Sequence, residues 1–98
     1  MNFKIGIDGG GTKTDFILTD EHGTKIAQRL SSGCNPSLIG REAAHALIQE
    51  QLRSLIEEAR SLDAEARISH TLFCMAGSRP FWREFGDELI NCGEVLTF

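Results

Sequence analysis

The strongest constraint on the fold is a strand that ends in an acid and three glycines, with a second strand directly after them. Apolar and other residues alternate over residues 3–7, the period of two that is typical of a strand. This strand brings Asp8 to its carboxyl end, just before the glycines 9–11. Residues 15–19 are again typical of a strand, so the glycines are predicted to form the turn of a β-hairpin.

The hairpin excludes two common phosphate-binding motifs. A P-loop needs glycine directly before Lys-Ser/Thr and a helix after it, whereas Thr12 separates Gly11 from Lys13. A dinucleotide fingerprint needs a third glycine where Thr14 stands, and it also opens a helix. A tight turn that binds nothing remains an alternative, although ordinary hairpins use a two-residue Asn-Gly or Asp-Gly turn.

The residue types in this turn suit a magnesium-bound phosphate. Glycines allow the backbone to pass close to another group with its amide hydrogens pointing at that group. We expect phosphate oxygens to be held by these amides and by one ammonium group, from Gly9, Gly10, Gly11, Thr12 and Lys13. The Asp8 carboxylate is the expected ligand of Mg²⁺, directly or through its waters.

The rest of the chain predicts alternating strands and helices. After a turn closed by Gly23, we expect the following elements: a strand from Lys25 to Leu30, a helix from Arg41 to about Leu62, a connector from Asp63 to Arg67, a strand from Thr71 to Ala76, a helix that begins at Pro80 and ends at Gly93, and a strand from Glu94 to Phe98.

Side-chain patterns predict which residues are buried. The unbroken apolar run at residues 71–76 predicts a strand covered on both faces, with Cys74 as a small hydrophobic residue. Trp82 is interpreted as core rather than as a ligand-stacking residue. The second helix has an apolar side formed by Phe81, Trp82, Phe85, Leu89 and Ile90. The first helix has a solvated face formed by Arg41, His45, Gln49, Arg53 and Glu57.

These elements predict an α/β domain with a mixed five-stranded sheet and helices packed on it. Two hairpins give an antiparallel half, and a crossover through the first helix lays the fourth strand parallel beside the first. The expected sheet order is 3-2-1-4-5, the order of a ribonuclease-H-like fold. Because the order reverses between strands one and four, a cleft is expected where the loops 8–12 and 77–79 meet.

Three segments carry a resemblance to a known superfamily. Residues 8–14 resemble the first phosphate motif of the actin-like ATPases, which include sugar kinases, Hsp70-type chaperones and actin. The triple glycine with Thr-Lys-Thr resembles most the N-acetylglucosamine kinase branch and the BadF/BadG/BcrA/BcrD ATPase family. The segments 32–40 and 72–77 are similar to later motifs of that branch, in the same order and spacing.

The resemblance implies ATP and Mg²⁺ as cofactors and a sugar as the small-molecule partner. It implies that Asn35 hydrogen-bonds the sugar and that Gly77 allows the sugar to approach closely. On the residues alone, Asn35 is equally well explained as a backbone cap before Pro36.

The implied function is the N-terminal part of an ATP-dependent sugar kinase for N-acetylglucosamine, glucosamine or a close relative. The resemblance places the catalytic Asp, the general base, after Phe98, together with a second domain that clamps adenosine. Residues 1–98 are therefore expected to be a truncated, inactive N-terminal domain of a protein of about 300 residues. Two alternatives remain: a BadF-type ATPase that energises an acyl-CoA reductase or dehydratase, and a non-catalytic sugar-sensing module.

Composition excludes several classes of partner. With 41% hydrophobic and 24% charged residues, the chain is typical of a globular domain. A net charge of −4 argues against nucleic acid or an anionic membrane as a partner. The Met1-Asn2 start leaves no room for a signal peptide, so we expect a cytoplasmic protein. An exposed edge of the last strand suggests a homodimer.

The cysteines are distant from one another and lack metal-binding spacing. Cys34 is a minor candidate for a role in the reaction because it neighbours Asn35.

Overall fold

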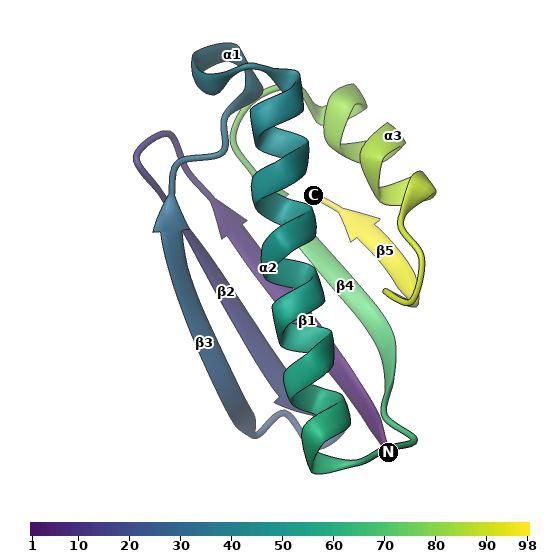
Figure 1. The fold of residues 1–98 in the computed structure, drawn as a ribbon. Helices are drawn as coiled ribbons and strands as arrows, with labels where there is room; N and C mark the ends of the chain where they lie inside the picture. The colour runs from purple at the N-terminus through teal and green to yellow at the C-terminus, as the bar shows by residue number, and fades with distance from the viewer.

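A computed structural model describes all residues, 1–98, as a five-stranded sheet with three helices (Figure 1). The elements in chain order are β1 (Asn2–Gly9), β2 (Lys13–Asp20), β3 (Lys25–Ser32), α1 (Pro36–Ile39), α2 (Arg41–Leu62), β4 (Arg67–Met75), α3 (Arg79–Glu88) and β5 (Glu94–Thr97). The strand order is β3-β2-β1-β4-β5, which confirms the order predicted from the sequence.

The pairing of the strands follows the predicted connections. β1 pairs antiparallel with β2, and β2 pairs antiparallel with β3, as two successive hairpins require. β4 lies parallel to β1 after the crossover through α2, and β5 lies parallel to β4 after α3. In this register Ile5 faces Leu18 on one side and Thr71 on the other, so all three side chains point to the same face of the sheet.

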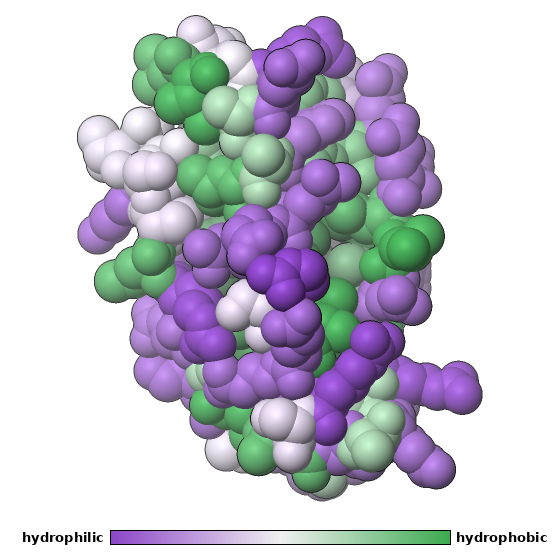
Figure 2. Space-filling view, viewed as in Figure 1, coloured by the Kyte–Doolittle hydropathy of each residue, from purple (hydrophilic) through white to green (hydrophobic).

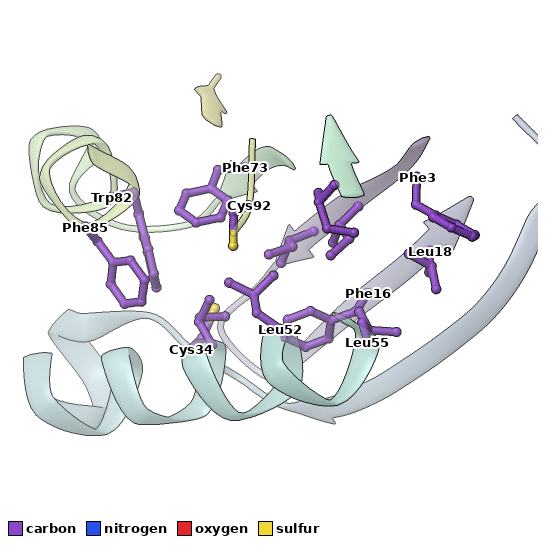
Figure 3. Close-up of a cluster of buried hydrophobic side chains, with 14 of the residues drawn as sticks. Phe3, Phe16, Leu18, Cys34, Leu52, Leu55, Phe73, Trp82, Phe85 and Cys92 are labelled. Carbon is purple, nitrogen blue, oxygen red and sulfur yellow. The ribbon is translucent and has the colours of Figure 1, made fainter. Parts of the chain in front are cut away.

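Both long helices cover that same face (Figure 1). The core lies between them and the sheet, where Leu52 and Leu55 of α2 oppose Phe16 and Leu18 of β2 (Figure 3). On the outer side of the molecule, hydrophilic side chains run along the middle of the helical face with hydrophobic residues on both sides of them (Figure 2).

The prediction that β4 is covered on both faces was wrong. Phe73 is fully buried against the helices, whereas Cys74, which points to the other face, is exposed. No helix of this chain packs on that second face (Figure 1), so side chains there, such as Leu72 and Ile17, are only half-buried among their neighbours on the sheet. β4 also begins four residues earlier than expected, at Arg67, because Arg67 and Ile68 already pair with β1.

α3 contributes an aromatic cluster to the core. Trp82 is fully buried and contacts Phe73, Phe81 and Phe85 with ring-centroid distances of 5.9, 4.8 and 5.7 Å. The interpretation of Trp82 as a core residue is therefore confirmed (Figure 3).

The expected end of this helix at Gly93 was wrong. α3 ends at Glu88, and Leu89 caps it in an extended conformation. Because the helix stops there, Ile90 lies outside it and is 79% exposed instead of forming part of the apolar side.

The assignment of His45 to a solvated face was also incomplete. Its ring lies 5.1 Å from that of Phe81 and 4.3 Å from that of Phe85, so this part of α2 packs against α3. The helical period of α2 could not reveal this contact, because the contact depends on where α3 docks.

α1, a single turn from Pro36 to Ile39, was not expected at all.

Candidate functional site

The glycine turn connects β1 to β2 at the carboxyl end of β1. The amide of Gly10 donates to the carbonyl oxygen of Lys13 at 2.9 Å and closes the turn. The two residues inside it, Gly11 and Thr12, are exposed, and neither amide donates to a backbone carbonyl. Of the amides predicted to hold phosphate, the turn therefore leaves those of Gly11 and Thr12 free, while that of Gly10 is engaged within the turn.

Two neighbouring loops pack tightly against this turn. The amide of Cys34 donates to the carbonyl of Gly10 at 3.2 Å, and that of Ala76 donates to the carbonyl of Gly9 at 2.6 Å. A Cβ atom on Gly9 would lie 2.6 Å from the sulfur of Cys34, and one on Gly33 would overlap the backbone of Gly11. Close packing thus requires glycine at positions 9 and 33. The sequence analysis predicted a packing role for neither residue.

Asp8 points to the open face of the sheet and is exposed. Its antiparallel neighbour is Asp15 and its parallel neighbour is Cys74, so two carboxylates stand side by side on this face. Asp15 accepts hydrogen bonds from Nε2 of Gln28 at 2.9 and 3.1 Å. Sequence reasoning missed Asp15, although the hairpin register would have placed it opposite Asp8.

These residues suit a hydrated magnesium ion better than a closed metal cage. A hollow of about 280 Å³ opens on this face and is lined in part by Asp8 and Asp15. The chain has no group of three or more His, Cys, Asp or Glu side chains placed to share a metal. Mg²⁺ is commonly held by one or two carboxylates while it keeps several waters, which fits this donor set. Lys13 is exposed at the start of β2, beside the turn.

The two residues predicted to bind sugar lie against each other. A Cβ atom on Gly77 would be 2.8 Å from Oδ1 of Asn35 and 3.1 Å from Cδ of Pro36. Gly77 also has a φ of 97°, a conformation that favours glycine. Oδ1 of Asn35 accepts from the amide of Ser37 at 3.0 Å, so the capping role that the sequence left open is present in the structure. The Nδ2 group of Asn35 is not used by this cap.

Cys34 is fully buried beneath the glycine turn. Burial raises the pKa of its thiol, which disfavours the thiolate that a nucleophile requires. The thiol therefore fits a packing role under Gly9 rather than a role in the reaction.

The first motif and the sugar-binding candidates thus form one continuous region. The hydrogen bonds of Cys34 and Ala76 join the glycine turn to the segments that carry Asn35 and Gly77. α3 begins directly afterwards, with Ser78 capping it by accepting from the amide of Phe81 at 3.3 Å. The loops expected to border a cleft therefore lie next to each other at the carboxyl ends of β1 and β4, where the amide of Ala76 donates to the carbonyl of Gly9.

Comparison with known proteins gives two informative matches. A curated N-acetyl-D-glucosamine kinase from Dictyostelium discoideum is 38% identical over 56 residues, which make up 57% of this chain and 18% of that protein. A crystal structure of a protein from Chromobacterium violaceum, provisionally named an N-acetylglucosamine kinase, matches with a TM-score of 0.58 and 22% identity. This match covers 97% of the present chain and 34% of the other. No protein-family model matches the chain.

The structural match shows that the chain has the actin-like, ribonuclease-H-like fold expected from the sequence. The sequence match supports a relationship with sugar kinases. The chain spans about a third of the length of the solved structure that it matches. None of its helices is long and apolar enough to cross a membrane.

Proposed function

We propose that this chain is the N-terminal, phosphate- and sugar-binding part of an ATP-dependent kinase. Its substrate is N-acetylglucosamine, glucosamine or a closely related sugar. The observation that carries the proposal is the hydrogen-bonded contact between the glycine turn and the segments of Asn35 and Gly77. A phosphate site and a polar pocket in direct contact are what transfer of a phosphoryl group to a sugar requires. The relationship to the Dictyostelium kinase supports this reading.

Each part of the site has a role in that reaction. The free amides of Gly11 and Thr12 would hold phosphate oxygens, and Lys13 would neutralise part of their charge. Asp8, with Asp15 beside it, would hold Mg²⁺ through its waters. When bound, the ion offsets negative charge on the phosphates. Such transfer depends mainly on positioning and charge neutralisation, so few protein groups are needed.

The sugar would lie at Asn35 and Gly77. Nδ2 of Asn35 would donate to a sugar hydroxyl, because Oδ1 already caps α1. The missing side chain at Gly77 would let the sugar lie close to the backbone. We propose that the general base and the domain that holds adenosine lie outside residues 1–98, consistent with a solved relative about three times as long.

A first test of this function replaces Gly10 by valine in the complete protein. A Cβ atom at Gly10 would lie 3.0 Å from the carbonyl oxygen of Lys13, so a branched side chain would distort the turn. Its φ is not positive, so the effect comes from this clash and from the blocked approach of the phosphate, and not from a φ that disfavours side chains. We expect the Kd for Mg-ATP, measured by calorimetry, to rise by about tenfold or more, or ~1.4 kcal/mol.

The matched control is Thr24→Val, an exposed residue in the other hairpin turn, which should leave the Kd unchanged. Equal ATP affinity in Gly10→Val and the parent protein would show that the glycine turn is only a turn.

A second prediction concerns the 98-residue chain by itself. β5 is an edge strand of four residues, and next to its open edge Leu96 is 36% and Phe98 60% exposed. An unpaired edge with apolar side chains favours pairing between copies. We expect the isolated chain to self-associate and to phosphorylate no sugar, since a positioned base alone typically contributes about 10²–10⁴-fold. Light scattering that gives a monomer mass at high concentration, or measurable sugar phosphorylation, would contradict this.

A further inference from the structure

Thr14 and Thr71 are the two polar residues of the chain whose side chains are fully buried. Thr14 follows Lys13 and pairs with Gly9 across the hairpin, so it lies directly behind the glycine turn. Its side chain points to the helical face of the sheet, whereas the Asp8 carboxylate points to the open face. Thr14 therefore lies next to the predicted phosphate site without being exposed to a ligand.

The Thr14 hydroxyl links the glycine turn to the segment that carries Asn35. Its Oγ1 atom donates to the carbonyl oxygen of Ser32, the last residue of β3, at 2.9 Å. The Ser31 hydroxyl donates to the same carbonyl at 3.3 Å, but that bond is open to solvent and water can replace its donor. Thr14 thus holds the end of β3 from inside the domain.

The segment between this carbonyl and Asn35 is short and packed on the turn (Figure 1). Only two residues separate them, and both are buried. The amide of the second, Cys34, donates to the carbonyl of Gly10 at 3.2 Å. The first, Gly33, lies so close to the turn that a Cβ atom would overlap the carbonyl of Gly11. A displacement of either side of this contact would therefore displace the other.

Transfer of a phosphoryl group depends on the distance between the phosphate and the accepting hydroxyl. A misplacement of about 1 Å can lower the rate by about 10²-fold. We propose that Thr14 is a positioning residue for this transfer. Through Ser32, its hydroxyl holds the Asn35 segment against the glycine turn and so sets how far the sugar lies from the bound phosphate. This inference rests on the proposed function and adds to it a residue that touches neither ligand.

Thr71 shows how a buried hydroxyl with only a structural role behaves in the same fold. Its Oγ1 atom donates to the carbonyl of Cys92 at 2.8 Å. Cys92 lies in the connection before β5 and belongs to neither the glycine turn nor the Asn35 segment. The two threonines thus make the same kind of hydrogen bond at the same burial, and only the bond of Thr14 adjoins the candidate site. A comparison of the two separates positioning from stability.

The test compares Thr14→Val, Thr14→Ser and Thr71→Val in the complete protein, with N-acetylglucosamine and Mg-ATP as substrates. Valine keeps the shape of threonine and removes the donor. We expect Thr14→Val to lower kcat by about 10–100-fold. The Kd of each substrate, measured separately by calorimetry, should change by less than about twofold, because each substrate keeps its own contacts.

Two variants show whether this loss comes from positioning. Thr14→Ser keeps the hydroxyl and should recover most of kcat. Thr71→Val should lower the urea midpoint of unfolding about as much as Thr14→Val and leave kcat unchanged. Unchanged kcat in Thr14→Val, an equal loss of kcat in Thr71→Val, or no recovery with serine would each overturn the inference. If valine at position 14 prevents folding, Thr14→Cys replaces it, because a thiol is a weak donor, and should show the same loss of kcat at unchanged Kd.

A second measurement does not depend on turnover. It follows the side-chain amide signal of Asn35 by NMR of the complete protein labelled at asparagine. Mg-ATP should shift this signal in the parent protein, and Thr14→Val should lose most of that shift. If the parent phosphorylates no sugar, the proposed function fails and this measurement decides on Thr14. A shift that Thr14→Val loses supports the link between the two segments, whereas an equal shift in both proteins, or none in the parent, overturns it.

Discussion

Replacing Asp8 by asparagine is expected to abolish magnesium-dependent phosphoryl transfer in the complete protein, with a loss of about 10²–10³-fold or more. The amide keeps the size of the side chain but removes the charge that holds the metal. Asp8 is exposed at the open face and its carboxylate makes no hydrogen bond within the chain, so the fold should not depend on it. We therefore expect the free energy of unfolding to change by less than about 1 kcal/mol.

The measurement is sugar-phosphate formation as a function of Mg²⁺ concentration, alongside a denaturant unfolding curve. The matched control is Asp87→Asn, an exposed aspartate of α3 away from the site, which should leave turnover unchanged. Asp15→Asn should show a smaller loss than Asp8→Asn, because Asp15 shares its carboxylate with Gln28. Full turnover in Asp8→Asn would show that Asp8 does not bind the metal.

Replacing Trp82 by alanine is expected to destabilise the fold by about 3–5 kcal/mol, a large part of the ~5–15 kcal/mol typical of a domain this size. The indole is fully buried and contacts three aromatic rings in the core (Figure 3). Its Nε1 also donates to the carbonyl of Ala76 at 3.0 Å, so the substitution leaves both a cavity and an unpaired carbonyl. Urea unfolding followed by far-UV circular dichroism measures the loss.

Trp82→Phe helps to separate the two contributions, since it keeps an aromatic ring in the core while it removes the donor and only part of the indole volume. It should cost roughly 1–2 kcal/mol, well below the alanine variant. An alanine variant that loses less than about 1 kcal/mol would mean that the core closes around the space with little penalty, contrary to the tight packing seen here.

The order of the strands was predictable because its signals are local. Period-two alternation in β1 and β2, and the turns at the glycines and at Gly23, fix two hairpins without reference to the rest of the chain. The helix between Arg41 and Leu62 then determines the crossover. The face of the sheet that stays open was not predictable. Leu72 and Cys74 point to that face and are apolar, so the β4 sequence looks buried on both faces although no helix packs on this one.

The site was predictable in its parts but not in its contacts. Asp8 and the glycines stand out in the sequence, whereas the pairing of Asp8 with Asp15 requires the strand register. The contact of Asn35 with Gly77 joins two segments about forty residues apart, so only the folded chain shows it. The helical period of α2 alone likewise could not predict that His45 packs on Phe81 and Phe85, because those rings belong to another helix.

The hydrogen bond from Trp82 to Ala76 makes the core a natural optical reporter of the site. Trp82 is the chain's single tryptophan, and Ala76, whose carbonyl accepts from it, also donates its backbone N–H to the carbonyl of Gly9 at the glycine turn. Any shift of that turn on ligand binding would alter the polarity around the indole and hence its emission. Fluorescence of the unlabelled protein could therefore follow phosphate binding in real time, from a residue that touches no ligand.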